Sequence, residues 1–134
     1  NVWHDKRIKN ASRIWRTAKK CKGLRVPNID NYIDHAAYKC YVFVELTLLK
    51  ADWTRERIIE EIKSLGVPCY SGSCSEVYLE KSFDDSGLRP KSNLPNAKKL
   101  GEESLMFLVH PTLSNSEIQK TCDVISAVMK TASK

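Results

Sequence analysis

The sequence lacks long apolar runs, glycine-rich loops and paired cysteines, and each absence excludes a class of protein. No apolar stretch approaches the length of a membrane span, and none has the layout of a signal peptide. Neither a phosphate-binding glycine loop nor a His-Glu-x-x-His motif is present. What remains is a chain of 134 residues with 42% hydrophobic content, which is enough for the core of one ordinary domain.

The five cysteines do not form a framework, because their number is odd and their spacings scatter. Cys69 and Cys74, with four residues between them, are too isolated for a zinc ribbon or an iron–sulfur site. Cys21, Cys40 and Cys122 fall within apolar patterns, which predicts buried thiols and a reducing, cytoplasmic setting. Cys74 precedes a short predicted helix. Its pKa would be lowered at the helix N-terminus, and the alternative is an inert thiol.

The positive charge is concentrated near the N-terminus. The net charge is +6, yet residues 1–25 hold nine Lys or Arg against one acidic residue, Asp5, and the other 109 residues sum to −2. This segment predicts either a nucleic-acid or membrane patch, or a solvated helix face, or a face that meets an acidic surface.

Hydrophobic periodicity predicts a small α/β domain, a three- to four-stranded sheet covered by helices, with a long N-terminal helix and a C-terminal helix. Residues 35–49 contain the clearest strand, apolar on both faces and therefore expected to be central and covered on both sides. The expected helices are 2–22, 55–65, 76–83, 95–100 and 117–129, the expected strands besides 35–49 are 67–70 and 105–109, and the expected loops are 24–34 and 84–94. Ser114 and Glu117 form a capping box before the last helix.

The turn that follows the helix 55–65 is the most informative segment. A glycine, Gly66, ends the helix, and a short strand then runs directly into small hydroxyl and glycine residues, Tyr70-Ser71-Gly72-Ser73-Cys74. Such a turn can approach a ligand or a partner domain closely. Its serines have no base nearby in sequence, so they are expected to shape the backbone rather than to act as nucleophiles. The three histidines lie far apart, which favours structural roles over a metal site.

No complete catalytic constellation is present, so the residues alone fit either a part of a larger enzyme or a binding module. The order of several short segments, however, resembles the C-terminal small domain of the DegT-type sugar aminotransferases, which are pyridoxal-phosphate enzymes of fold type I. The matching segments are Gly23-Leu24-Arg25-Val26-Pro27, His35-Ala36-Ala37-Tyr38, Tyr41-Val42-Phe43-Val44, Gly66-Val67, Leu94-Pro95-Asn96-Ala97, Glu102-Glu103-Ser104-Leu105-Met106 and Val109-His110-Pro111-Thr112-Leu113-Ser114.

The resemblance implies a single domain over residues 1–134, with 1–22 as a linking helix and 35–134 as the α/β body. In this family the cofactor lysine and most phosphate contacts lie in a large N-terminal domain, so the chain is expected to hold no catalytic, cofactor-binding or metal-binding residues of its own, and alone to be inactive. Pyridoxal phosphate, a nucleotide-linked keto sugar and an amino donor would bind the parent enzyme, expected to be a cytoplasmic homodimer.

Within that resemblance, one wall of the substrate site would come from the turn and the entry to the central strand. The expected substrate-binding residues are Tyr70, Ser71, Gly72, Ser73, Cys74, His35 and Tyr38. Family members often carry a His-Tyr pair in this turn, and this chain does not. The helix 2–22 would bridge two domains and pack loosely on this one, exposing Trp3, Ile8 and Trp15.

Two alternatives stay open. One is a free-standing nucleic-acid-binding α/β module that uses residues 6–25, although no aromatic or glycine-rich reader motif accompanies them. The other is a protein-interaction domain without catalytic ancestry. The sequence does not specify the sugar, the carbon that is aminated or the amino donor.

Overall fold

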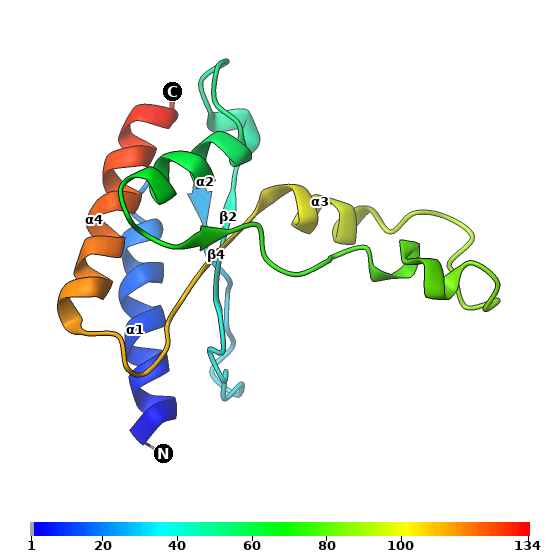
Figure 1. Cartoon of the computed structure of the whole chain (residues 1–134), viewed down its shortest axis with the longest axis horizontal. Coiled ribbons are helices and arrows are strands. Elements are labelled where there is room, and N and C mark those ends of the chain that lie inside the picture. Colours follow the sequence, from blue (N-terminus) through cyan, green and yellow to red (C-terminus); the bar gives the residue numbers. More distant parts are fainter. Residues whose placement is uncertain (1) are drawn as a thin grey trace.

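The computed structural model describes residues 2–134 and shows helices packed on a four-stranded antiparallel sheet (Figure 1). The helices are α1 Val2–Ala18, α2 Arg55–Ser64, α3 Pro95–Glu103 and α4 Asn115–Ala132, the strands are β1 Leu24–Arg25, β2 Cys40–Val44, β3 Cys69–Tyr70 and β4 Ser104–Phe107, and the 3₁₀ turns are η1 Leu46–Leu48, η2 Val77–Leu79 and η3 Lys81–Phe83. The predicted fold class is confirmed.

The sheet has the order β1-β2-β4-β3, so β2 and β4 are its central strands. Cys40 lies opposite Phe107, and Phe107 lies opposite Cys69, which fixes the register of three strands. The prediction of a loop over 24–34 missed β1, in which Leu24 pairs with Val44. A strand of two residues has too few positions to show an alternating pattern, which is why the sequence did not reveal it.

The inner face of the sheet carries the core. Antiparallel partners point to the same side, so Val44, Cys40 and Phe107 share this face. The core also includes buried residues of α1, α2 and α4. The stripe predicted for the last helix is confirmed, because its five residues Ile118, Cys122, Ile125, Val128 and Met129 are all buried.

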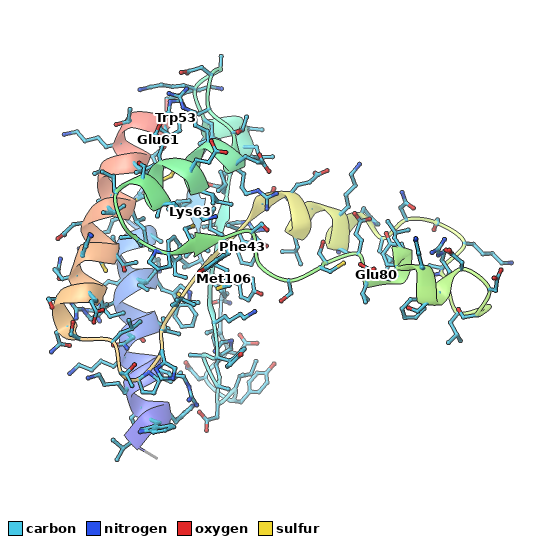
Figure 2. All side chains as sticks on the ribbon, in the orientation of Figure 1. Phe43, Trp53, Glu61, Lys63, Glu80 and Met106 are labelled. Carbon is cyan, nitrogen blue, oxygen red and sulfur yellow. The ribbon has the colours of Figure 1, made fainter. Side chains whose placement is uncertain are left out.

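The outer face is only half covered, which corrects the prediction that β2 is covered on both sides. Tyr41 and Phe43 are partly exposed there, and Tyr70 is 44% exposed on the neighbouring edge. Arg25 stacks on Phe43 with its guanidinium carbon 4.3 Å from the ring centroid, and it pairs with Glu103 of α3 at 2.8 Å. Figure 2 shows Phe43 and Met106 near the middle of the molecule, where the C-terminal end of α3 leads into β4.

α1 packs more closely than predicted. It ends at Ala18 instead of Lys22, and Ala11, Ile14 and Ala18 are fully buried against α4 and β2. Asn10 is also buried and donates hydrogen bonds to the carbonyls of Val109 and His110. The expectation of a loosely packed helix is therefore wrong for residues 10–18. Its role as a link to another domain stays a prediction.

The exposed patch predicted on α1 is smaller than expected. Ile8 and Trp15 pack against the core, and Trp15 donates a hydrogen bond to the carbonyl of Tyr41 at 2.9 Å. Trp3 alone of the three is largely exposed, at 63%.

Local signals set the boundaries of the other helices. Thr54 caps α2 by accepting from the amide of Arg57 at 3.1 Å, and Gly66 ends it with a φ of +74°. The predicted capping box of Ser114 and Glu117 is confirmed at the start of α4. The predicted helix 76–83 is instead the two 3₁₀ turns η2 and η3.

Residues 74–94, here called the arm, project away from the sheet and return through α3 (Figure 1). Its own polar contacts hold it together. Arg89 donates to the carbonyls of Tyr78 and Glu80 and pairs with Asp84, while the hydroxyl of Tyr78 accepts from the amide of Leu94 at 3.0 Å. Its side chains Val77, Leu79 and Leu88 are exposed, whereas Tyr78 is buried.

Candidate functional site

The turn after β3 is anchored on the outer face by Tyr41. The hydroxyl of Tyr41 accepts from the amide of Ser73 at 3.3 Å and lies 3.2 Å from the Ser73 hydroxyl oxygen. Gly72 has a φ of +91°, and a Cβ there would lie 2.6 Å from the ring carbon Cε1 of Tyr41. Glycine is required at 72 by its backbone conformation and by contact with this ring. The sequence prediction had attributed it to close approach of a ligand or a partner domain.

The entry to β2 is held by α1. His4 donates to the carbonyl of His35 at 3.3 Å, and Arg7 donates to the carbonyl of Ala36 at 3.3 Å. The ring of His35 meets the ring of Trp15 edge-on, with centroids 5.7 Å apart. The basic N-terminal helix therefore fixes the position of a predicted site residue.

A strained backbone sits beside His35. Ala37 is fully buried with a φ of +44°, a left-handed conformation that costs a residue with a side chain roughly 1–2 kcal/mol. The Nδ1 atom of His35 accepts from the amide of Ala37 at 3.0 Å, which supports this conformation and leaves the proton of the neutral ring on Nε2.

Three predicted site residues line one open hollow, here called the tyrosine hollow. It measures about 510 Å³, and its polar residues are Asp34, His35, Tyr38, Lys39, Tyr41 and Ser73. Tyr38 is 78% exposed at its rim. Hydroxyl, imidazole and aromatic groups gathered in this way can donate and accept hydrogen bonds and present a ring for stacking.

The other half of the turn lines a second hollow, here called the arginine hollow. It measures about 400 Å³ and includes Arg55, Glu56, Lys63, Tyr70, Ser71 and Gly72. Arg55 is anchored, since it donates to the carbonyls of Gly101 and Ser104 and pairs with Glu56. Lys63 lies above the Tyr70 ring, with Nζ 5.4 Å from the centroid. The turn thus forms the ridge between two hollows with charged and aromatic walls.

Cys74 does not join either hollow. Its thiol faces Glu80 of the arm, with Sγ 3.4 Å from the carboxylate, and this contact raises the pKa of Cys74. The idea of a lowered pKa is therefore wrong, because a carboxylate and not a helix N-terminus meets the sulfur. Cys69 is fully buried, and burial raises its pKa to about 12. Burial likewise raises the pKa of Cys40.

The described residues, 2–134, contain no group of three or more His, Cys, Asp or Glu side chains placed to hold a metal ion. All five cysteines are free thiols, of which Cys40, Cys69 and Cys122 are buried. Within the same range no helix is long and apolar enough to cross a membrane. The histidines make structural contacts: His4 joins α1 to the carbonyl of His35, His35 accepts from the amide of Ala37, and Nδ1 of His110 contacts the hydroxyl of Thr112.

Sequence reasoning missed Tyr41 and Arg55 as parts of the site. The alternation of side chains along β2 could have indicated Tyr41, because it lies between the inward-facing Cys40 and Val42 and therefore points to the outer face. Tyr70 points to the same face, since Tyr41 and Tyr70 are both paired with Met106. Arg55 carries no such signal. Only the fold shows that the first residue of α2 reaches the end of α3.

Comparison with solved structures relates this arrangement to known enzymes. An aminotransferase from Psychrobacter cryohalolentis matches with a TM-score of 0.87 and 49% sequence identity, over 96% of this chain and 35% of its own. A DegT DnrJ EryC1 StrS aminotransferase from Brucella abortus matches with a TM-score of 0.74 and 18% identity, over 93% of this chain and 31% of its own. NtdA from Bacillus subtilis, solved with bound cofactor PMP, matches with a TM-score of 0.76 and 16% identity, over 96% of this chain and 29% of its own.

No protein-family model matches the chain, and no curated protein matches it in sequence. The solved structures show that the chain has the fold of one part of DegT-type aminotransferases and spans about a third of the length of those proteins. The resemblance seen in the sequence is confirmed.

Proposed function

We propose that this chain is the small domain of a nucleotide-sugar aminotransferase, an enzyme that transfers an amino group from a donor to a keto sugar. The observation that supports the proposal most strongly is the 49% identity to an aminotransferase over 96% of the chain. The fold alone is shared with proteins described as sugar aminotransferases. Synthesis of surface polysaccharide is the use of such an amino sugar that we favour.

The turn 69–74 and the entry to β2 would form one wall of the substrate site. In that role Tyr38 and Tyr70 offer rings at the rims of their hollows, while the hydroxyl of Ser73 and the imidazole of His35 can hydrogen-bond sugar hydroxyls. Arg55 and Lys63 offer positive charge for the phosphates of a nucleotide-linked sugar. Cys74 contributes only through the backbone of the turn.

The chain's own residues do not fit a complete cofactor site. Pyridoxal phosphate supplies the amino-carrying group in such enzymes and needs a lysine and a phosphate cradle. No lysine among residues 2–134 is buried, and the two hollows beside the turn are open. We therefore assign the cofactor, the catalytic lysine and the phosphate contacts to a large domain of the longer enzyme.

The proposal includes the setting of the longer enzyme. The large domain is the first partner of this chain, the enzyme works as a homodimer in the cytoplasm, and it binds neither nucleic acid nor membranes. The exposed side chains of Trp3 and Tyr38 suit contact with another protein surface.

The test is the enzyme encoded by the complete gene. We expect a few hundred further residues that contain a cofactor lysine, an absorption band of bound pyridoxal phosphate, and amino transfer to a nucleotide-linked keto sugar. A complete gene without such a region, or salt-sensitive binding to unrelated nucleic acids, would contradict the proposal and support one of the alternatives.

The chain alone provides a second check. After dialysis against buffer without cofactor, the 134-residue chain should show no cofactor absorption. A persistent band that disappears on substitution of one particular lysine of this chain would place the cofactor site here and contradict the division of roles.

A further inference from the structure

A third hollow, unrelated to the turn 69–74, lies where α1 and α4 both end. Figure 1 shows the two helices side by side, with their C-terminal ends on the same side of the molecule. This hollow, here called the lysine hollow, measures about 360 Å³. Its polar residues are Lys20, Lys22, Ser126, Lys130, Ser133 and Lys134. No aspartate or glutamate is among its lining residues.

The hollow is built on fixed contacts. The hydroxyl of Ser133 donates to the carbonyl of Lys22 at 2.6 Å, and the hydroxyl of Ser126 donates to the carbonyl of Cys122 at 3.0 Å. The floor is formed by Met129, which is 2% exposed. The backbone positions of the lysines are therefore set by the packing of α4 against the turn that follows α1.

The positive charge in the hollow is not balanced by the protein. Among the described residues, the side chains of Lys20, Lys22 and Lys130 have no hydrogen-bond or ion-pair partner, whereas Lys134 donates to the carbonyl of Thr47. Lysines do favour helix C-termini, but each helix end offers only about half a negative charge. In the 134-residue chain, the two helix ends supply about one negative charge and the terminal carboxylate of Lys134 supplies another, against four lysine ammonium groups, which leaves a surplus of about two positive charges.

The chemistry of the lining selects the kind of ligand. Both serine hydroxyl hydrogens are already donated to carbonyls, so a ligand would meet mainly ammonium donors. Ammonium groups on flexible stems bind phosphate as point charges and impose little geometry. Such a site favours an anion with several charges over a neutral sugar or a single carboxylate. The gathering of the lysines round one hollow favours a compact anion over an extended duplex.

We infer that the lysine hollow binds a compact anion with more than one phosphate group, of the inorganic polyphosphate class. This site is independent of the proposed aminotransferase role, since it lies at the helix ends and shares no residue with the tyrosine or arginine hollow. The proposed site also gives a role to two lysines of the basic segment 1–25, Lys20 and Lys22, which line the lysine hollow.

The test is titration of the 134-residue chain with inorganic tripolyphosphate at low ionic strength. Calorimetry measures the affinity, and amide chemical shifts locate the binding site. The K20Q/K22Q variant removes two exposed lysines of the hollow. The matched control K6Q/K9Q removes the same charge from the other end of the basic segment. We expect the wild type to bind, K20Q/K22Q to weaken binding about tenfold or more, and K6Q/K9Q to change it less than about twofold.

Amide shifts should move mainly at the turn after α1 and at residues 126–134. Equal weakening by both variants would overturn the inference, because it would mean diffuse attraction to the whole basic segment. Absence of binding by the wild type at millimolar tripolyphosphate would also overturn it. A K20Q/K22Q variant that loses thermal stability but keeps its affinity for tripolyphosphate would overturn the inference as well. The two lysines would then stabilise the C-terminal ends of the helices without binding the anion.

Discussion

The two faces of the sheet differ in what they contact and in what they expose. The inner face meets three helices, and its residues Val42, Leu105 and Phe107 are fully buried. The outer face carries Tyr41, Phe43 and Tyr70, which stay partly exposed under a thin cover of α3 and the turn. Beyond it the arm extends outwards and is held by its own polar contacts (Figure 2, where Glu80 marks the arm). The inner face therefore carries most of the stability, whereas the turn 69–74, which we propose for substrate binding, lies on the outer face.

The largest expected contrast is between a core residue and an arm residue. Phe107→Ala should lower the free energy of unfolding by about 3–5 kcal/mol, because it leaves a cavity in a fully buried strand. Leu88→Ala, at a side chain that is 76% exposed, should change it by less than about 0.5 kcal/mol. Urea unfolding of both variants checks this. Similar losses for the two would mean that the arm belongs to the same core.

The next contrast concerns α1, which was predicted from the sequence to be a linking helix packed loosely on the α/β body. Asn10→Ala should cost about 1–3 kcal/mol, since it removes a buried amide and leaves the carbonyls of Val109 and His110 without their donor. Lys9→Ala, one residue away and exposed, is the matched control. If the two variants unfold at the same urea concentration, α1 is not part of the core.

A smaller effect distinguishes a helix of the inner layer from the helix beside the arm. Ser114 caps α4, whereas the N-terminus of α3 has no side-chain cap. Ser114→Ala should therefore cost about 1 kcal/mol. Thermal unfolding measures the loss. A loss below the error of the measurement would mean that packing alone fixes the start of α4.

The capping box also predicts a dependence on pH. Hydrogen bonds from Ser114 lower the pKa of Glu117 below its usual 4.5. A pKa that is lower in the folded state adds stability above the unfolded pKa and loses it as the pH falls through the folded pKa. Glu117→Gln should therefore lower the thermal midpoint slightly at pH 7, and the difference should fade below pH 4.5. A difference that grows in acid would contradict this.

The smallest expected effect on overall stability lies in the arm. Tyr78→Phe removes the acceptor for the amide of Leu94 and the donor to Glu76. Urea unfolding should change by less than about 0.5 kcal/mol, while protease cleavage within 76–94 should become faster. Unchanged cleavage would mean that Tyr78 does not hold the arm together.

The inner face was largely predictable from the sequence, because the spacing of apolar residues along a helix or strand indicates which side chains are buried. The stripe of α4, the end of α2 at Gly66 and the capping box of Ser114 were all inferred from spacing. The packing of α1 was not, since a stripe shows which residues are buried but not against which element. Predicting the outer face was harder. Gly72 fits under the ring of Tyr41, and Cys74 meets Glu80, and both contacts depend on how distant segments meet.

We propose that the turn 69–74 serves substrate binding, while the inner face of the sheet holds the fold. To test this, turnover on a keto sugar and the thermal midpoint are both measured for the Tyr70→Ala and Val42→Ala variants of the longer enzyme. Gly72→Val is unsuitable, because its side chain would strain the backbone and meet Tyr41.

We expect Tyr70→Ala to lower turnover about tenfold or more with little change in thermal midpoint, since the side chain is half exposed. Val42→Ala should lower the midpoint while the folded fraction keeps its turnover. Normal turnover in Tyr70→Ala, or a loss of activity that only follows unfolding, would contradict the claim and remove this turn from the substrate site.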